Sequence, residues 1–173
     1  NLVWNTSMLN PEGTVLEVLG KAGSADAEIS SLAKQFNFQY KFPDKVLNEA
    51  EKISFKLTDE ELRARVDYRD KTVITIDPYD AKDFDDALSI EELENGNYSV
   101  GIHIADVSHY VAKKSKLNDE ALIRGNSIYL VGTVIPMLPE KLSNGICSLV
   151  PNEERLTYSV IAELTVNGKL VDY

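Results

Sequence analysis

The sequence is poor in cysteine and has no long apolar run. Its single cysteine, Cys147, cannot form an internal disulfide bond, so we expect a protein of a reducing compartment, the cytoplasm. No apolar segment approaches the roughly 20 residues that a membrane-spanning helix needs. The amino terminus also lacks the basic and then apolar pattern of a secretion signal. The sequence therefore predicts no membrane partner.

Basic residues are also scarce. The chain has 18 Lys and Arg against 28 Asp and Glu, which gives a net charge of −10. Proteins that bind nucleic acid through its phosphates usually carry a basic stripe, and this composition does not supply one. If nucleic acid is the partner, we expect the basic surfaces to lie elsewhere in a longer protein. The length of 173 residues and the 43% hydrophobic content are those of an ordinary globular domain with a real core.

Acidic residues concentrate in one stretch, from Asp77 to Asp86, which reads D-P-Y-D-A-K-D-F-D-D. Five aspartates in ten residues repel one another unless a cation lies among them. Carboxylates without a neighbouring His or Cys favour magnesium, manganese or calcium over zinc or copper. A calcium-binding EF-hand loop would need a glycine after Asp85, and none is present. The stretch therefore predicts a site for a hard divalent cation.

A plainer interpretation is that this stretch begins a helix. Asp77 would be the N-cap and Pro78 the first helical residue. That interpretation does not explain why Asp83, Asp85 and Asp86 crowd together just before an apolar run. On a strand, Asp83 and Asp85 would share one face and Asp86 would point away from it. A loop that leads into a strand fits these residues better.

The acidic stretch resembles the catalytic signature of the ribonuclease II and ribonuclease R exoribonucleases, the RNB family. Two further blocks extend the likeness, and all three are nearer to ribonuclease R than to ribonuclease II. The second block is I-A-D-V-S-H-Y-V at 104–111. The third is V-I-P-M-L-P-E-K-L-S-N-G at 134–145, followed by C-S-L at 147–149.

This resemblance implies a processive 3′-to-5′ exoribonuclease that hydrolyses RNA to nucleoside 5′-monophosphates. It implies magnesium as the cofactor, with manganese as the alternative, and single-stranded RNA or structured RNA with a 3′ overhang as the partner. Four residues match the family's catalytic aspartates: Asp77, Asp83, Asp85 and Asp86. Of these, Asp77, Asp83 and Asp86 would hold the metal, and Asp85 would orient the attacking water. Tyr129 matches the tyrosine that stacks on the base at the 3′ end; without the resemblance it would be read as a core tyrosine.

The resemblance also divides the chain. Residues 1–20 would be the end of a preceding cold-shock or OB-like domain, and residues 21–173 the N-terminal part of the RNB catalytic domain. The family active site also uses an arginine from the second half of that domain, so we expect this chain alone to be inactive or barely active. The alternative is a non-catalytic scaffold that keeps the fold and binds RNA or a partner. Retention of all four aspartates speaks against the scaffold. The sequence leaves the oligomeric state open.

For the fold we expect an α+β arrangement, with N-terminal helices followed by a mostly antiparallel sheet with helix cover. Apolar spacing predicts a short strand within 14–19 and then three helices. Ser24 or Asp26 would cap the first helix. A capping box of Thr58 and Glu61 would begin the third, with Leu62 and Val66 on its buried side. The period then changes to two, with hairpins at Asn95-Gly96 and Asn167-Gly168. Further elements are expected as follows: a helix at 117–124, a strand at 127–130, a loop at 136–145 and a strand from 157.

Several other polar residues are candidates for a function. His103 and His109 could form an acid and base pair, although a place inside a strand argues against His103. Asp106 could approach the acidic stretch, but we favour a structural role in which it accepts backbone hydrogen bonds at a turn. Arg124 is a candidate phosphate contact. Arg63, Arg65 and Arg69 could contact phosphates, but we expect them to form a solvent-exposed face, because acidic residues lie among them.

Overall fold

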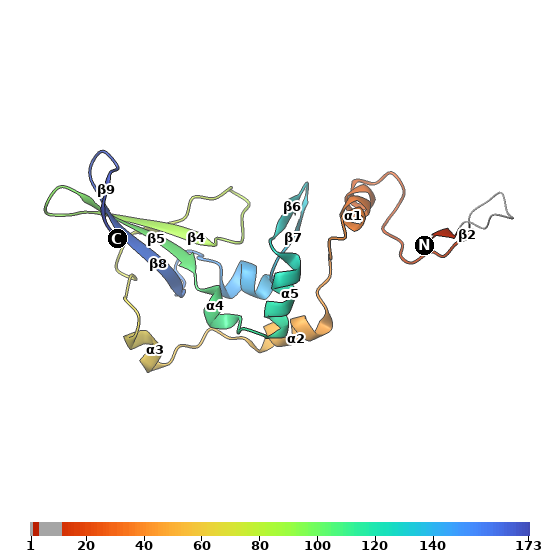
Figure 1. Cartoon of the computed structure of the whole chain (residues 1–173), viewed down its shortest axis with the longest axis horizontal. Helices are drawn as coiled ribbons and strands as arrows, with labels where there is room; N and C mark the ends of the chain where they lie inside the picture. Colours follow the sequence, from red (N-terminus) through yellow and green to blue (C-terminus); the bar gives the residue numbers. More distant parts are fainter. Residues whose placement is uncertain (1, 4–11) are drawn as a thin grey trace. The chain divides into compact units, whose positions relative to one another are not determined.

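The computed structural model describes residues 2–3 and 12–173. The chain divides into two compact units, one of Asn1–Tyr40 with Tyr129–Ile135, the other of Lys41–Ile128 with Pro136–Tyr173. Helices and antiparallel strands occur together, which confirms the predicted α+β class (Figure 1). Within the described ranges, no helix is both long and apolar enough to cross a membrane.

In its described residues, the first unit contains one helix and two short strand pairs. Strand β1 (Leu2–Val3) pairs with β2 (Glu12–Gly13), and β6 (Ile128–Leu130) pairs with β7 (Thr133–Ile135). Helix α1 (Ala25–Gln35) begins, as expected, with a cap from the Ser24 side chain. The strand expected within 14–19 is wrong, because the backbone there is irregular and Val15, Leu16 and Val18 are exposed. Alternating apolar residues form a strand only where a partner strand is present.

The second unit is built on a five-stranded antiparallel sheet in the order β3-β4-β5-β8-β9 (Figure 1). Both predicted hairpins are present, and Gly96 and Gly168 have the positive φ that their turns require. The strands are β3 (Val73–Ile74), β4 (Asp86–Glu92), β5 (Tyr98–Ala105), β8 (Thr157–Leu164) and β9 (Leu170–Asp172).

The second unit also contains several helices. They are α2 (Asp44–Lys52), α3 (Asp59–Arg63), α4 (Val107–Tyr110), α5 (Lys116–Arg124) and the π-helix η1 (Lys141–Ile146). Helix α2 packs against α5 and η1. The buried residues of this core are Val46, Ala50, Ala105, Leu117, Leu142 and Cys147. The core therefore joins the end of β5 to the segment that follows Pro139.

Two local predictions in this unit are wrong. The loop expected at 136–145 contains η1, because Pro139 lies at the start of that helix, where a missing N–H does no harm, and its carbonyl accepts from Ser143 (3.1 Å). Leu62 and Val66 were expected to be buried, but both are exposed, Val66 by 84%. Helix α3 has the predicted capping box of Thr58 and Glu61, yet it is only five residues long and buries no side chain.

The buried face of the sheet is the one that carries small and polar residues. On β5, Gly101, His103 and Ala105 are buried, whereas Ile102 and Ile104 are nearly half exposed. Tyr68 covers the buried face, with its ring centroid 5.0 Å from that of His103. Asp86 pairs with Ile104 in the register of β4 and β5, so the acidic stretch joins the sheet beside this exposed apolar row.

Candidate active site

The acidic stretch forms a loop that runs from β3 into the first residue of β4, Asp86, as predicted (Figure 1). A turn inside it is closed by the N–H of Ala81, which donates to the carbonyl of Pro78 (3.0 Å). The helix that Asp77 would have capped does not form. Residues 77–86 are called the acidic loop below.

One buried side chain of the third sequence block holds this loop. The hydroxyl of Ser148 accepts from the N–H of Phe84 (3.0 Å) and donates to the carbonyl of Lys82 (2.7 Å). The N–H of Leu149 also donates to the carbonyl of Phe84 (2.8 Å). Ser148 has no exposed surface. The backbone on both sides of Asp83 is therefore fixed to the segment that follows η1.

The second block contacts the loop from the sheet. The N–H of Ala105 donates to the carbonyl of Asp85 (3.0 Å), directly before the β4 pairing begins at Asp86. The next residue, Asp106, donates its N–H to the carbonyl of Leu156 (2.8 Å). The three blocks that are separate in the sequence therefore meet in the fold, with the acidic loop between the other two.

Arg155 supports this arrangement. Its Nε donates to the carbonyl of Ser148 (2.8 Å), and its Nη1 donates to the carbonyl of Glu154 (2.8 Å). Sequence reasoning assigned no role to Ser148 or Arg155. The only available signal for Ser148 was its place in the third block, and no pattern in the sequence pointed to Arg155.

The carboxylates of the loop differ in exposure. Asp77 and Asp83 are partly buried, whereas Asp80, Asp85 and Asp86 are exposed. Asp77 Oδ2 is buried and has no hydrogen-bond partner, which costs free energy that a bound cation would offset. An all-oxygen donor set of this kind fits a hard divalent cation.

The described side chains do not form a complete set of metal ligands. In the part of the chain that the structure describes, no group of three or more His, Cys, Asp and Glu side chains lies close enough to hold a metal ion. The combination of Asp77, Asp83 and Asp86 as metal ligands therefore stays a prediction. The structure supports it through the fixed backbone around Asp83 and the unpaired oxygen of Asp77.

Asp106 has the structural role that we favoured. Its Oδ1 accepts from the N–H of His109 (3.2 Å) at the start of α4 and from the hydroxyl of Ser108 (2.8 Å). Its Oδ2 lies 2.8 Å from Nη2 of Arg65. Burial works to raise the pKa of Asp106, but the bonds from Arg65 and Ser108 outweigh it and the pKa is lowered. Arg65 is therefore a partner of a half-buried ion pair, and its expected place on a solvent-exposed face is wrong.

The two histidines have separate partners. His103 is only 3% exposed, and its Nε2 and Nδ1 lie 2.9 Å from Ser89 Oγ and 2.8 Å from Ser159 Oγ. Burial lowers the pKa of His103, which favours the neutral ring. His109 lies 3.6 Å from Glu61 Oε1. These contacts make His103 a satisfied core residue and give no support to a histidine acid and base pair.

Arg124 and Tyr129 were both expected to contact substrate. The Arg124 side chain is only 5% exposed, pairs with Glu120 (2.9 Å) and lies over the ring of Phe42, so the phosphate contact is wrong. Tyr129 lies on β6 and is 65% exposed, which excludes an ordinary core role. Tyr129 belongs to the first unit, whereas the acidic loop belongs to the second. Its stacking on an RNA base therefore stays a prediction.

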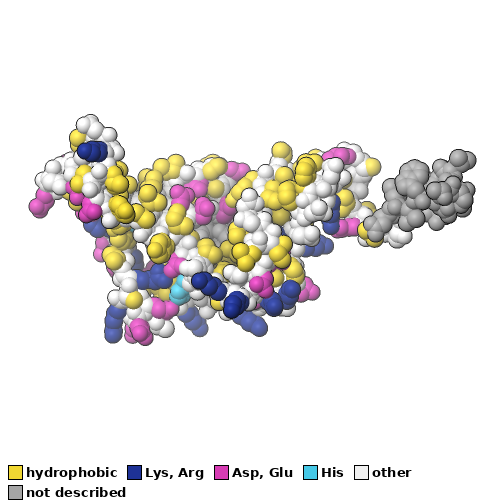
Figure 2. All heavy atoms as spheres, viewed as in Figure 1, with side chains coloured by type: hydrophobic (Ala, Val, Ile, Leu, Met, Phe, Trp, Pro, Cys, Tyr) yellow, Lys and Arg dark blue, Asp and Glu magenta, His cyan; other side chains and the backbone are white. Residues whose placement is uncertain are grey.

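Charge is unevenly distributed over the second unit. In Figure 2, acidic side chains gather around the acidic loop above β4, whereas Lys and Arg side chains follow the lower margin near α4 and α5. Basic residues are therefore scarce in the composition, but those present are concentrated on one part of this surface.

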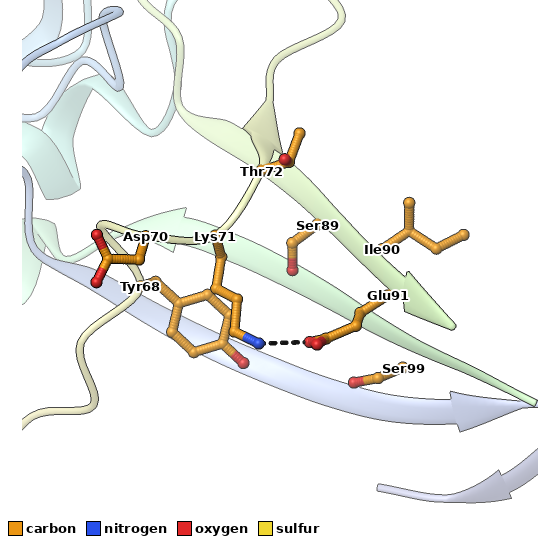
Figure 3. Close-up of a pocket in the computed structure, with 8 residues that line it drawn as sticks. All are labelled: Tyr68, Asp70, Lys71, Thr72, Ser89, Ile90, Glu91 and Ser99. Carbon is orange, nitrogen blue, oxygen red and sulfur yellow. Dashed lines mark hydrogen bonds and ion pairs between the residues drawn. The ribbon is translucent and has the colours of Figure 1, made fainter. Parts of the chain in front are cut away.

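A separate cavity of about 290 Å³ lies against the sheet, away from the aspartates of the acidic loop (Figure 3). Lys71 and Glu91 face each other across it and form an ion pair (2.6 Å), and Ser89 and Ser99 lie on the strands beside them. The charges of Lys71 and Glu91 neutralise each other, and Ser89 is bound to His103. This cavity offers no converging set of reactive groups.

Comparisons with known proteins agree with the arrangement of the three blocks. A family model described as cold shock domain matches residues 2–43, and one described as RNB domain matches residues 65–173. Ribonuclease R of Thermotoga maritima is 49% identical over 166 residues, which cover 95% of this chain and 23% of that protein. The predicted boundary between residues 20 and 21 stays a prediction.

Two solved structures of Mycoplasma genitalium RNase R, one with double-stranded RNA and one with ribose-methylated single-stranded RNA, are similar to this chain. Both are 34% identical, have a TM-score of 0.85 and cover 91% of this chain. This chain covers 28% and 24% of theirs, so it spans about a quarter of the length of these relatives. The RNB match includes the acidic loop, the end of β5 and the segment around Ser148, and the chain belongs to the RNB domain family.

Proposed function

We propose that this chain carries the acidic metal-binding loop of an enzyme that degrades RNA from the 3′ end to nucleoside 5′-monophosphates in a processive manner. One observation carries the proposal: four aspartates, Asp77, Asp83, Asp85 and Asp86, lie on a loop whose backbone is fixed by both other sequence blocks. A loop held in this way can present carboxylates with the precision that phosphodiester hydrolysis requires.

Magnesium is the proposed cofactor, with manganese as the alternative. Asp77, Asp83 and Asp86 would hold it, and the buried, unpaired Oδ2 of Asp77 supports this assignment. A bound divalent cation lowers the pKa of water and neutralises charge that develops on the phosphate. Asp85 is exposed and lies directly before Asp86, where it would orient the attacking water. Asp80 receives no catalytic role.

The proposed substrate is single-stranded RNA or structured RNA with a 3′ overhang. The Mycoplasma genitalium relatives were solved with double-stranded and single-stranded RNA, which supports an RNA substrate. Tyr129 would stack on the base at the 3′ end, and the residue is 65% exposed. We also propose a cytoplasmic location, which suits a chain whose single cysteine is buried and unbridged.

The test compares this chain with the full-length protein on a single-stranded RNA labelled at its 3′-terminal nucleotide. Mg²⁺ and Mn²⁺ are titrated in, and EDTA serves as the blank. We expect the full-length protein to release labelled mononucleotide. This chain alone should be inactive or barely active, because it would lack an arginine that stabilises the transition state by several kcal/mol, on the order of an arginine finger. If neither protein degrades RNA with any divalent cation, the enzyme proposal fails and the scaffold alternative takes its place.

A further inference from the structure

We propose that Ser148 is a positioning residue for the acidic loop, and that its hydroxyl holds the backbone on both sides of Asp83 at the spacing that cation binding requires. This inference rests on the proposed function. It concerns how the loop is held, since Ser148 has no exposed surface with which to touch RNA.

The hydroxyl of Ser148 is fully used by the loop. It donates its proton to the carbonyl of Lys82 (2.7 Å) and accepts from the N–H of Phe84 (3.0 Å). A serine hydroxyl has one proton to donate, so no proton remains for a catalytic step. These two bonds form a clamp on the residues on either side of Asp83, and the Asp83 carboxylate takes no part in them. Ser148 therefore acts on the site only through the conformation of this backbone.

Ser148 is itself fixed on three sides. Its N–H donates to the carbonyl of Gly145 (3.0 Å), and its carbonyl accepts from Arg155 Nε (2.8 Å). Its neighbours in the chain are Cys147, which is part of the buried core, and Leu149, which bonds to Phe84. The clamp therefore connects the acidic loop to η1 and to the packed core. A movable loop would not need such an attachment.

Loss of the hydroxyl would leave two partly buried backbone groups, the carbonyl of Lys82 and the N–H of Phe84, without their Ser148 partner. These groups would turn toward water, because a polar group without a hydrogen-bond partner is costly. That rotation changes the direction of the Asp83 side chain between them. Removing a residue that orients metal ligands typically lowers metal affinity or activity about 10- to 100-fold. We expect an effect of this size for Ser148→Ala.

The experiment uses the full-length protein with Ser148→Ala and a matched control, Ser115→Ala. Ser115 caps α5 by accepting from the N–H of Asn118 (3.0 Å) and does not bond to the acidic loop. Mn²⁺ affinity is measured by electron paramagnetic resonance, RNA affinity by fluorescence anisotropy in EDTA, and turnover as a function of Mg²⁺. For Ser148→Ala we expect Mn²⁺ affinity and kcat to fall about 10- to 100-fold, with RNA affinity and KM unchanged. Ser115→Ala should change only the melting temperature.

Ser148→Cys covers the case in which Ser148→Ala does not fold. A thiol is close in shape to the hydroxyl but is a weak donor and acceptor, so this variant should fold and still lose Mn²⁺ affinity. Wild-type Mn²⁺ affinity in either folded variant would overturn the inference. If the wild type binds Mn²⁺ but degrades no RNA, the proposed function fails, and the Mn²⁺ affinity of the variants still decides the role of Ser148. A wild type that binds no Mn²⁺ overturns both.

Discussion

Arg65 and Asp106 are 41 residues apart in the sequence, and Arg65 Nη2 lies 2.8 Å from Asp106 Oδ2. Asp106 directly follows Ala105, whose N–H holds the carbonyl of Asp85. The pair therefore fastens the segment before β3 to the end of β5, one residue away from a contact to the acidic loop. It is largely shielded from solvent, with 31% of the Arg65 side chain and 11% of the Asp106 side chain exposed.

Replacing Arg65 should lower the stability of the chain. Arg65→Ala leaves the Asp106 carboxylate without its charged partner, and we expect the free energy of unfolding to fall by about 1 to 3 kcal/mol at pH 7, the range for a hydrogen bond to a charged group. Urea denaturation measures the change. Arg63→Ala is the matched control, because Arg63 lies exposed on α3, and it should cost less than about 0.5 kcal/mol.

The Arg65 effect should also depend on pH. The pKa of Asp106 is lowered in the folded chain below its ordinary value of 3.8. A group of this kind stabilises the fold fully above its unfolded pKa, and its contribution disappears as the pH falls through the lower, folded value. The stability difference between wild type and Arg65→Ala should therefore be constant from pH 7 to about 5 and shrink below about 4. An equal difference at pH 3 and pH 7 would contradict the ion pair.

His103 should make the fold sensitive to mild acid. Burial lowers its pKa below 6.5, so between the two values the unfolded chain binds more protons than the folded one. Stability should therefore fall as the pH drops from about 6.5 toward the folded value. Nuclear magnetic resonance of the imidazole protons should give a midpoint below 6.5 for His103. Urea midpoints measured at several pH values should fall less steeply with falling pH in His103→Gln than in the wild type. His109→Gln should keep the part of this pH dependence that His103 causes.

Gly101 should tolerate no side chain. A Cβ at this position would lie 2.6 Å from His103 Nε2 and still closer to Ser89 Oγ, two atoms that bond to each other across β4 and β5. Gly101→Ala should therefore lower the free energy of unfolding by about 1 to 3 kcal/mol through overpacking. Gly145→Ala is the control, because the nearest atom to its Cβ would be 3.8 Å away. Equal melting temperatures for the two variants would show that the Ser89 and His103 contact is not tightly packed.

The sequence predicted those parts of the fold that depend on local pattern. The cap at Ser24, the capping box of Thr58 and Glu61, and the hairpin at Asn95-Gly96 each follow from a few neighbouring residues. The sheet face was harder to predict. Ile102 and Ile104 alternate with Gly101 and His103, but alternation does not show which side is covered, and here Tyr68 covers the polar side.

The candidate site was also predicted only in part, because a local pattern reveals the acidic loop but not the residues that hold it. The acidic loop stands out because five aspartates in ten residues are unusual for a surface. Ser148 and Arg155 could not be found in this way, because Ser148 bonds to backbone groups of a segment distant in the sequence and Arg155 bonds to the backbone carbonyl of Ser148. Arg65 was misjudged because its nearest acidic neighbours in the sequence suggested local pairing, whereas its partner, Asp106, lies on another element.

Asp77 should destabilise the metal-free protein and stabilise the metal-bound one. Its Oδ2 is buried without a partner, so Asp77→Ala removes that cost and should raise the free energy of unfolding in EDTA by on the order of 1 kcal/mol. Mg²⁺ should raise the melting temperature of the wild type, because a ligand that binds only the folded state stabilises it. The variant should show no such shift. Differential scanning fluorimetry of the full-length protein, with and without Mg²⁺, measures both effects, and a Mg²⁺ shift that persists in Asp77→Ala would remove this residue from the ligand set.

Asp85 should matter for turnover and not for binding. Its carboxylate is exposed and its own backbone carbonyl is held by Ala105, so Asp85→Asn should leave the loop in place. The amide cannot accept a proton or orient water as the carboxylate does, so we expect turnover in the full-length protein to fall at least about 100-fold. RNA affinity, measured by fluorescence anisotropy in EDTA, should stay within about twofold. Asp80→Asn, the neighbouring exposed aspartate without an assigned role, is the matched control and should keep most of the activity. A parallel loss of RNA binding and turnover in Asp85→Asn would mean that Asp85 organises the substrate site and does not orient the attacking water.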